Sequence, residues 1–483
     1  MTMNKPIVWR PQPKQVQFLR RTEYEALYGG AAGGGKSDAL LAEALYQVDI
    51  PQYKALILRK TFPQLKELID RSLQLYKAAF PRARYNATEH TWHFPSGAQI
   101  IFGSMQRTED RIKYQGQRYD FIAFDELTHF TWDEYSYMFS RNRPSRGPSN
   151  GRKTHVYMRA ATNPGGIGHA WVKARFIDAA PPMTPIVDDV QIEGPDGSLQ
   201  TVQRSRIFVP ATVFDNQILL HDDPNYIGAL GMLPEAERQA LLYGSWDSFS
   251  GQVFREWKND PEHYKDHLWT HVIDPFPIPK SWKIWRGFDW GYTKPFSVGW
   301  YAADPDGKIY RIREYYGCTD QPNTGVQMNA AEIARNIREI ETQDPMLKGH
   351  DIIGVADPAI FEESRGESIA AIMAKHPNYV IWHPGDHHRL AGKNQYHYRF
   401  AFDQNGECLF QVFNTCRHFI RTIPSLVYDS KHVEDIDTDG EDHIYDECRY
   451  VLMEAPISPR AAVIPESPMG DPLNQYRRNT PWR

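Results

Sequence analysis

The sequence predicts an α/β protein with more than one domain, and three observations lead to this fold class. The chain has 483 residues, whereas domains of roughly 100 to 200 residues are common, so two or three domains are expected. In the first 165 residues, short apolar runs alternate with helical patterns, which is typical of a mostly parallel sheet covered on both faces. A second series of strand and helix patterns starts near residue 281, after a stretch that lacks this rhythm.

Apolar runs and helical patterns follow one another along the first half of the chain. Stretches rich in proline, glycine and polar residues separate them, as expected for loops. The strand candidates are residues 55–58, 98–102, 121–124 and 156–161, the helix candidates are 38–47, 64–79 and 234–243, and an exposed loop at 141–152 and a loop or small insertion at 178–204 complete the set.

The second half begins with a strand pattern and a hairpin. Residues 383–399 carry four histidines and three basic residues, so they could be a DNA-contacting loop, an added metal site or a solvated loop, and the solvated loop is the simplest interpretation. The strand candidates are residues 283–289, 297–303, 308–316 and 352–356, a turn is expected at 304–307, and the helix candidates are 324–341, 416–428 and 442–453.

Composition excludes several classes of protein. Hydrophobic residues make up 41% and charged residues 24%, the balance of a soluble globular protein. No uncharged run approaches the roughly 18 apolar residues of a membrane helix, and the N-terminus lacks a signal-peptide core, so no membrane partner is expected. The four cysteines form no CxxC pair, which argues against a zinc ribbon or a disulfide framework. The net charge is −5, so any DNA contact must use a local patch.

Residues 30–37, which read Gly-Ala-Ala-Gly-Gly-Gly-Lys-Ser, fit the GxxxxGK[ST] pattern of a phosphate-binding loop. A short apolar stretch precedes the loop and a good helix former follows it, which is the context that the motif requires. Glycines let backbone amides turn toward phosphate oxygens, and the helix N-terminus adds a favourable dipole. Lysine would neutralise the β and γ phosphates, and serine would bind Mg²⁺. The residues expected to bind nucleotide are Gly30, Gly33, Gly34, Gly35, Lys36 and Ser37.

Two adjacent acids end the apolar strand candidate at 121–124. Asp125 would hold Mg²⁺, directly or through water, and Glu126 would polarise the attacking water. Together with the phosphate-binding loop, these acids predict ATP hydrolysis with ATP and Mg²⁺ as cofactors.

In the second half, Asp289 and Asp357 lie at the ends of two strand candidates. A third group of acidic residues lies on the last helix candidate. On a helix, Asp442 and Asp446 are i,i+4 neighbours, and His443 and Asp446 are i,i+3 neighbours, so these side chains can converge. The order of strand acid, hairpin, helix, strand acid and helix acid is the layout of an RNase H-like fold. Carboxylates at the centre of such a sheet hold two divalent metals, Mg²⁺ or Mn²⁺, which cleave phosphodiesters.

These patterns divide the chain into parts. We expect a P-loop ATPase domain at 1–250 with a small lid or linker subdomain at about 178–250, a linker at 251–280, and an RNase H-like nuclease domain at 281–455. The tail at 456–483 contains several prolines, lacks an apolar period and ends in basic residues. We expect this tail to be flexible and to order on a partner.

With both halves described, the sequence resembles the large terminase subunit of tailed bacteriophages over nearly its whole length. The resemblance rests on the two halves in this order and on several short segments. These are 13–15, which looks like the adenine-contacting segment, 58–61, which matches a motif after the second strand, 161–165, which looks like the coupling motif, 244–246, which resembles the end of the ATPase region, and 442–450, which is close to the last nuclease motif.

The resemblance implies roles for further residues. Gln15 would read the adenine base, and Thr162 and Asn163 would sense the γ-phosphate. Members of the family differ in the metal ligand of the last motif. Asp446 with His443 is the first choice here, and Asp442, which lies at the helix start and could cap it, is the second.

The family's ring motors also use an arginine from a neighbouring subunit. Arg111 is the first candidate for this residue, and Arg141 and Arg143 are the alternatives. Gln115 falls near the place where some members carry the arginine.

The implied function is that of a genome-packaging motor subunit. ATP hydrolysis would drive double-stranded DNA into the prohead through the portal, and the nuclease would cut concatemeric DNA to start and end packaging. Expected partners are the portal protein, the small terminase subunit and further copies of the chain in a ring, expected to be a pentamer. The protein would act in the host cytoplasm and transiently at the portal vertex, and would be absent from the mature virion.

Two other functions remain as alternatives. A helicase-nuclease of the DNA-repair type would need strand-separation motifs after the coupling segment, and no convincing Gln-x-x-Gly-Arg-x-x-Arg pattern is present. A structural capsid or portal component with an ATP-binding switch would not need the ordered acids of the second half.

Overall fold

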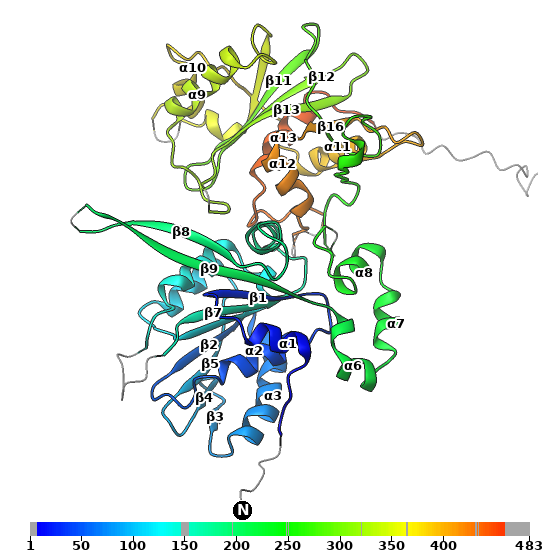
Figure 1. Cartoon of the computed structure of the whole chain (residues 1–483). Helices are drawn as coiled ribbons and strands as arrows, with labels where there is room; N and C mark the ends of the chain where they lie inside the picture. The colour runs from blue at the N-terminus through cyan, green and yellow to red at the C-terminus, as the bar shows by residue number, and fades with distance from the viewer. Residues whose placement is uncertain are drawn as a thin grey trace, which may run out of the picture.

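The computed structural model describes residues 7–458 except 146–153, 196, 248, 250, 320, 364, 365, 430, 431 and 433. Within these residues the chain folds into two halves, each built around its own sheet, and the halves are stacked as Figure 1 shows. The predicted α/β fold class is confirmed. Most of the loop expected at 141–152 and of the tail expected at 456–483 lies outside the described residues.

The first half is built on a mostly parallel sheet. Its central strands are apolar and buried along their length, as expected where helices cover both faces. Antiparallel pairs occur at the two edges. In spatial order, the described strands are β3 (Arg84–Asn86), β4 (Thr91–His93), β5 (Gln99–Ser104), β2 (Lys54–Arg59), β6 (Phe121–Asp125), β7 (Tyr157–Thr162), β1 (Glu25–Gly30), β9 (Leu199–Ala211) and β8 (Ile186–Glu193).

Helices cover this sheet on two faces, because successive side chains of a strand point to opposite sides. Ile57 of β2 packs in the apolar cluster of one face, and Leu56 and Leu58 pack in the cluster of the other. The first face is covered by α1 (Pro13–Leu19), α2 (Lys36–Ala44) and α3 (Phe62–Ala79), and the second by α4 (Trp132–Tyr137) and α5 (His169–Val172).

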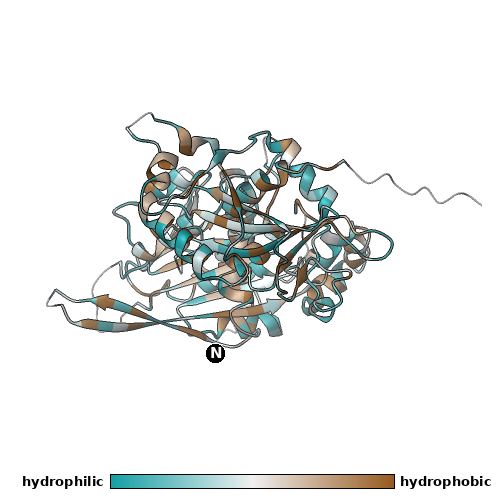
Figure 2. Ribbon diagram, turned by 90° about the horizontal axis from the view of Figure 1, so that it is seen from above, coloured by the Kyte–Doolittle hydropathy of each residue, from teal (hydrophilic) through white to brown (hydrophobic). Residues whose placement is uncertain are grey.

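The loop or insertion expected at 178–204 is instead mainly a long antiparallel hairpin, β8 with β9. Figure 2 shows the hairpin projecting from the rest of the molecule. Its outer part is exposed on both faces, so its residues need no alternation of apolar and polar side chains, which is why the sequence pattern did not indicate strands. Next to the phosphate-binding loop, a small cluster of short helices follows, namely α6 (Gln217–Asp222), α7 (Tyr226–Gly231) and α8 (Glu235–Leu241).

The second half contains a mixed sheet. The strands β11, β12 and β13 are antiparallel neighbours, and β14 pairs in parallel with β11. In spatial order, the described strands are β10 (Val272–Ile273), β16 (Phe410–Phe413), β13 (Ile309–Tyr316), β12 (Ser297–Ala303), β11 (Lys283–Asp289), β14 (Ile352–Ala356) and β15 (His383–Pro384). The helices are α9 (Ala330–Gln343), α10 (Ile369–Ala374), α11 (Arg389–Phe400), α12 (Arg417–Thr422) and α13 (His443–Met453).

Three segments of the second half differ from the sequence expectation. The helix expected at 324–341 begins only after Asn329, whose side chain caps it by accepting a bond from the Glu332 amide. The helix expected at 416–428 ends earlier as α12, and Pro424 follows in a 3₁₀ turn. The loop considered for the histidine-rich stretch contains α11, which packs against α13.

The segment expected to be a linker contributes to the core of the second half. Its strand β10 pairs with β16, and the side chains of Val253, Phe254 and Ile278 are buried in the same apolar cluster as β11. The domain boundaries themselves stay a prediction. Among the described residues, no helix is both long and apolar enough to cross a membrane.

Candidate functional site

The phosphate-binding loop connects the end of β1 to the start of α2. Gly33 and Gly35 have φ values of 72° and 69°, a left-handed conformation that glycine adopts most easily. At Gly29, just before the loop, a Cβ atom would lie 2.3 Å from the carbonyl oxygen of Thr162. The close approach of β1 and β7 therefore requires a glycine there.

Lys36 is buried at the base of this loop and binds two partners. Its ammonium group donates to Asn163 Oδ1 at 2.7 Å and also to the carbonyl oxygen of Ala31. Burial lowers the pKa of Lys36, and the carboxylates of Glu126 and Asp125 oppose this effect. The fold thus brings together Lys36 and Asn163, which the sequence assigned separately to nucleotide binding.

Asp125 lies at the end of β6 and is only 1% exposed. Ser37 Oγ donates to Asp125 Oδ2 at 3.1 Å, so the two residues predicted to hold Mg²⁺ are in contact. Arg59, at the end of β2, binds the same carboxylate through Nε at 2.8 Å and Nη2 at 2.7 Å. A hydroxyl and a carboxylate beside a helix N-terminus are oxygen donors that suit Mg²⁺ with a nucleotide. Arg59 was noted only as part of a motif, and its partner became visible in the fold.

Glu126 follows Asp125 in a left-handed conformation with φ 57°, which is unusual for a residue other than glycine. Burial raises the pKa of Glu126 and Asp125 adds to this effect, whereas Lys36 and Arg59 oppose it. The next turn is tied to the coupling segment, because Thr128 Oγ1 lies 2.8 Å from Thr162 Oγ1.

Gln15 reaches the phosphate-binding loop from α1. Its side-chain amide donates to the carbonyl oxygen of Gly35 at 2.8 Å, so the residue expected to read adenine also braces the loop. Asn216, just before α6, donates in the same way to the carbonyl oxygen of Gly33 at 2.5 Å. No sequence pattern pointed to Asn216, because this contact joins positions far apart in the chain.

His169 joins the coupling segment to the end of the first half. Its Nδ1 accepts a hydrogen bond from the Gly165 amide at 3.0 Å, and its Nε2 lies 3.0 Å from the carbonyl oxygen of Trp246. The ring packs on Trp246 and Phe249, with centroid distances of 5.3 Å and 4.1 Å. Burial lowers the pKa of His169 to about 3, so the imidazole is neutral and Nε2 donates to Trp246.

Arg111 lies in a 3₁₀ helix (Thr108–Tyr114) at the surface of the first half. Its side chain is 34% exposed and lies 3.9 Å from Asp133. Its guanidinium group also lies over the ring of Tyr137, as does that of Arg141. Arg143 is exposed on the following loop. The described contacts of Arg111 are thus with Asp133 and Tyr137 of its own chain.

Asp289 and Asp357 follow neighbouring strands of the second sheet, as predicted. Asp289 ends β11, and the Asp357 amide, just after β14, donates to the carbonyl oxygen of Phe288 at 3.0 Å. Asp357 Oδ1 accepts a hydrogen bond from the Ala359 amide at 3.0 Å, which fixes the orientation of this carboxylate.

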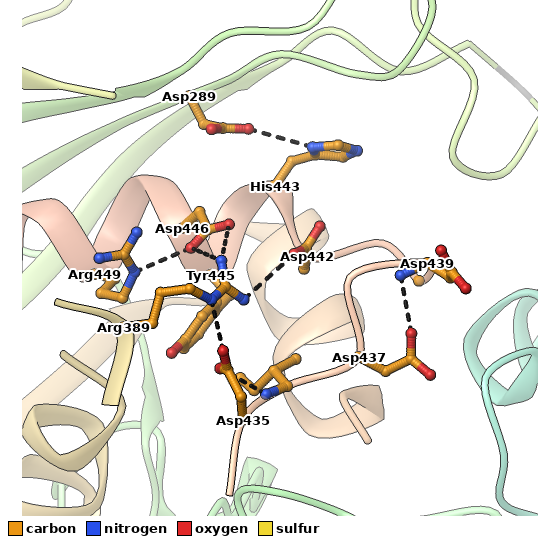
Figure 3. Close-up of polar contacts among 12 residues, drawn as sticks. Asp289, Arg389, Asp435, Asp437, Asp439, Asp442, His443, Tyr445, Asp446 and Arg449 are labelled. Atoms are coloured by element: carbon orange, nitrogen blue, oxygen red, sulfur yellow. Dashed lines mark hydrogen bonds and ion pairs between the residues drawn. The ribbon is translucent and has the colours of Figure 1, made fainter. Parts of the chain in front are cut away.

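His443 is in contact with Asp289. Its Nδ1 lies 3.2 Å from Asp289 Oδ2, as Figure 3 shows. Burial raises the pKa of Asp289 to about 6, His443 opposes this rise, and Asp446 and Asp357 add to it. The fold therefore places the start of α13 beside the two strand acids.

The two acids of α13 have different surroundings (Figure 3). Asp446 accepts hydrogen bonds from Arg389 Nη1 at 3.1 Å and from Arg449 Nε at 3.0 Å. Asp442 is buried at the start of the helix, 4.0 Å from Arg389 Nη2. Its side chain makes no capping hydrogen bond, so the capping role considered for it is not observed. Burial raises the pKa of Asp442, and Asp446 adds to this effect.

The donor set of this centre fits a divalent cation in its chemistry. Carboxylates are suitable ligands for Mg²⁺ or Mn²⁺, whereas an imidazole is more typical of sites for transition metals. Within the described part of the chain, no three His, Cys, Asp and Glu side chains form a ready-made metal site. Two of the candidate ligands are engaged with other side chains, because Asp289 contacts His443 and Asp446 contacts two arginines.

The two halves contact one another close to these centres. Lys294, in the loop after β11, lies 3.4 Å from Asp133 of α4. A small cavity between the halves is lined by Ile167 and Trp171 on one side and by Pro322, Asn323 and Gly440 on the other.

The folds and motifs of the two halves define the class of protein, which is a P-loop fold joined to a fold with an RNase H-like order of strands. Residues 27–258 match the family described as "Terminase large subunit, T4likevirus-type, N-terminal". This part of the chain is therefore similar to the N-terminal domain of large terminases, in line with the resemblance that the sequence predicted. No match was found among curated proteins.

Several solved structures are similar to the chain. The large terminase of a thermophilic bacteriophage has 16% identity and a TM-score of 0.38, with 92% of this chain and 99% of that chain covered. The large terminase of bacteriophage HK97 has 10% identity and a TM-score of 0.45, with 92% of this chain and 95% of that chain covered. The P22 large terminase nuclease domain has 18% identity and a TM-score of 0.32, with 42% of this chain and 92% of that chain covered.

Proposed function

We propose that this chain is the ATP-hydrolysing and DNA-cutting subunit of a phage genome-packaging motor. One observation carries the proposal. A phosphate-binding loop with its acidic strand and a sheet with acids on two neighbouring strands occur in one chain, in the order expected for that function. The match of residues 27–258 to the large terminase family model supports the same function.

In the first half, ATP would bind with its phosphates on the loop and on the N-terminus of α2. Lys36 would release Ala31 and Asn163 and bind the β and γ phosphates. Ser37 and Asp125 would hold Mg²⁺, and Glu126 would orient the attacking water and accept its proton.

Hydrolysis would be transmitted through the coupling segment. Asn163 contacts Lys36 at one end of this segment, and the Gly165 amide binds His169 at the other. His169 in turn contacts Trp246 and Phe249, where the chain leaves the first half. A change at the γ-phosphate thus has a continuous path of packed groups toward the second half, which supports a role in DNA translocation.

In the second half, Asp289, Asp357, His443 and an acid of α13 would hold two divalent cations. When bound, such ions would stabilise the attacking and leaving oxygens of a phosphodiester. Arg389, which binds Asp446, would neutralise the acidic cluster and keep α11 against α13. Because the acids act on the phosphate backbone, the chain's own residues would impose little sequence preference on cutting.

The proposal includes an assembly. The subunit would work on double-stranded DNA as a ring, expected to be a pentamer, on the portal protein, with the small terminase subunit selecting DNA. The surface position of Arg111 supports a role toward a neighbouring subunit rather than toward its own loop. The protein would act in the host cytoplasm and at the portal vertex, and would leave before the virion matures.

The experiment that tests this function is a packaging assay with purified components. The full chain, ATP, Mg²⁺, the small subunit and portal-bearing proheads are mixed with concatemeric DNA, and the DNA protected from added DNase is measured. Protection that requires ATP and all protein components is expected. A chain that hydrolyses ATP and cuts DNA but protects none would contradict the packaging role.

A further inference from the structure

The loop that follows Asp289 reaches from the nuclease centre to the first half. Residues 290–294 leave the end of β11, and Lys294 is exposed at the end of this stretch. Its Nζ atom lies 3.4 Å from Asp133 Oδ2, on α4 of the first half. This contact joins a residue five positions from a strand acid of the nuclease centre to the half that carries the phosphate-binding loop.

The backbone of this loop is held in place by the segment that follows β13. The Gly325 amide donates to the carbonyl oxygen of Thr293 at 2.9 Å. A Cβ atom on Gly325 would lie 2.3 Å from the carbonyl oxygen of Lys294 and 2.4 Å from that of Tyr292, so this close approach requires glycine. Phe296, which is buried in the core of the second half, anchors the far end of the loop. Lys294 therefore combines a fixed backbone with an exposed side chain.

Asp133 is also held firmly on its own side of the contact. It lies in the first turn of α4 between Trp132 and Glu134, which are both buried. The Glu134 carboxylate accepts a hydrogen bond from the Thr131 amide at 2.9 Å, which closes a capping box at the start of the helix. The distance between Lys294 and Asp133 consequently depends on how the two halves are stacked.

The contact between the two side chains is weak enough to be exchanged for another one. The side chain of Lys294 is 45% exposed and that of Asp133 is 37% exposed, and ion pairs at such positions contribute little to stability. Arg111 Nη1 also lies 3.9 Å from an oxygen of Asp133, so the carboxylate keeps a cationic neighbour when Lys294 leaves. Lys294 is thus available to another anion at small cost.

A DNA phosphate is the anion that the position of Lys294 favours. Lys294 follows the same end of β11 at which Asp289 lies, and five residues of chain span at most about 18 Å. On each strand of a duplex, phosphates follow one another every 3.4 Å or so along the helix axis. A duplex whose scissile phosphate lies at Asp289 therefore has other phosphates within reach of Lys294. An ammonium group neutralises such a phosphate without reading the base sequence.

We propose that Lys294 binds a backbone phosphate of DNA beside the nuclease centre, and that Asp133 of the first half competes with the DNA for this lysine. This inference rests on the proposed nuclease function. It gives the contact between the halves a regulatory role, because DNA binding at the nuclease is restrained while the halves are stacked as in Figure 1.

The test measures plasmid cutting by the full chain with Mn²⁺ at a series of DNA concentrations. Lys294→Gln should raise KM by about 3-fold or more and leave kcat unchanged, because a contact away from the scissile bond is lost equally before and in the transition state. The slope of log(kcat/KM) against log salt concentration should become shallower by about 1. Lys294→Arg keeps the charge and should retain nearly the unaltered KM.

The competition is tested by removing the carboxylate of the first half. Asp133→Asn frees Lys294 and should lower KM by about 2- to 5-fold, the range of an exposed ion pair. In a Lys294→Gln background, Asp133→Asn should have no further effect, whereas a general loss of negative charge would lower KM in both backgrounds. Lys283→Gln is the matched control, because Lys283 is exposed at the opposite end of β11 and should leave KM unchanged. ATP turnover and thermal melting show whether each variant is folded.

The possible outcomes separate this inference from the function on which it rests. If the unaltered chain cuts DNA while Lys294→Gln keeps its KM and salt dependence, the DNA contact is refuted and the nuclease stands. If Asp133→Asn leaves KM unchanged, or lowers it equally in the Lys294→Gln background, the competition is refuted. If the unaltered chain does not cut DNA, the proposed nuclease fails and this inference fails with it.

Discussion

The two centres of the molecule differ in how their charged groups are held. In the first half, residues of separate motifs bind each other, as Lys36 with Asn163 and Ser37 with Asp125. In the second half, the acids bind cationic or neutral groups, as Asp446 with Arg389 and Asp289 with His443. Members of the predicted site thus contact one another in both halves, whereas Asp446 is also bound by Arg389, which lies outside the predicted set.

The strand acids of the second half should give the greatest loss of activity. Asp289→Asn and Asp357→Asn should reduce plasmid cutting with Mn²⁺ to the background of the assay, because asparagine retains the shape but loses the charge that offsets two divalent cations. ATP turnover should stay unchanged. Cutting at the unaltered rate by either variant would refute the two-metal interpretation.

Variants of the first half should lose ATP turnover and keep DNA cutting. Lys36→Ala and Glu126→Ala should each lower ATP turnover by on the order of 10²-fold or more, because the phosphates lose a buried cation or the water loses its base. Both variants should still cut plasmid DNA with Mn²⁺, and thermal melting serves as the folding control. ATP hydrolysis at the unaltered rate in Lys36→Ala would show that the loop is not the nucleotide site.

A smaller effect distinguishes the two acids of α13. The sequence favoured Asp446 as the metal ligand, but its carboxylate is bound by two arginines, whereas the contact of Asp442 with Arg389 is more distant, at 4.0 Å. We therefore expect Asp442→Asn to weaken Mn²⁺-dependent cutting by about 10-fold or more. Asp446→Asn should instead lower the melting temperature, because it removes the negative charge that pairs with Arg389 and Arg449. If Asp442→Asn cut DNA normally and Asp446→Asn did not cut it, Asp446 would be the metal ligand, as the sequence predicted.

The weakest effect concerns pH and affects both halves alike. Burial lowers the pKa of His169 to about 3 and that of His271 to about 4, below the ordinary value of 6.5. The unfolded chain therefore binds more protons below pH 6.5, so the stability from each neutral histidine is complete above that pH. It is lost as the pH falls toward the folded-state pKa, by about 1.4 kcal/mol per pH unit.

The measurement is urea unfolding at pH 7.5 and pH 5. His169→Gln should flatten the pH dependence of the transition that reports the first half, and His271→Gln that of the second. An unchanged slope in both variants would mean that these histidines are already protonated in the folded protein.

Local patterns in the sequence allowed the prediction of the phosphate-binding loop and of the acid at the end of β6. A phosphate-binding loop and an acid at a strand end are made by consecutive residues, so residues 30–37 and Asp125 could be placed before the fold was known. The neighbouring positions of Asp289 and Asp357 also followed from a familiar strand order. Arg59 could be noted as part of a motif, but its contact with Asp125 could not be predicted. This contact depends on β2 and β6 becoming neighbours in the sheet.

Other features left no regular pattern in the sequence. The hairpin β8–β9 is exposed on both faces in its outer part, so it has no apolar period to detect. The buried residues between 251 and 280 occur singly or in pairs within polar sequence. Asn323 meets His443 across 120 positions, a contact that only the folded chain creates.

The place where β10 joins the second sheet bears on how such proteins exchange parts by recombination. Val253 and Phe254 already belong to the second core, so this core begins near Gly251 and not near residue 281. A hybrid gene joined at 281 would inherit a nuclease with β16 as an open edge and with an incomplete core. We therefore expect crossovers that yield working hybrids to lie nearer codon 251 than codon 281.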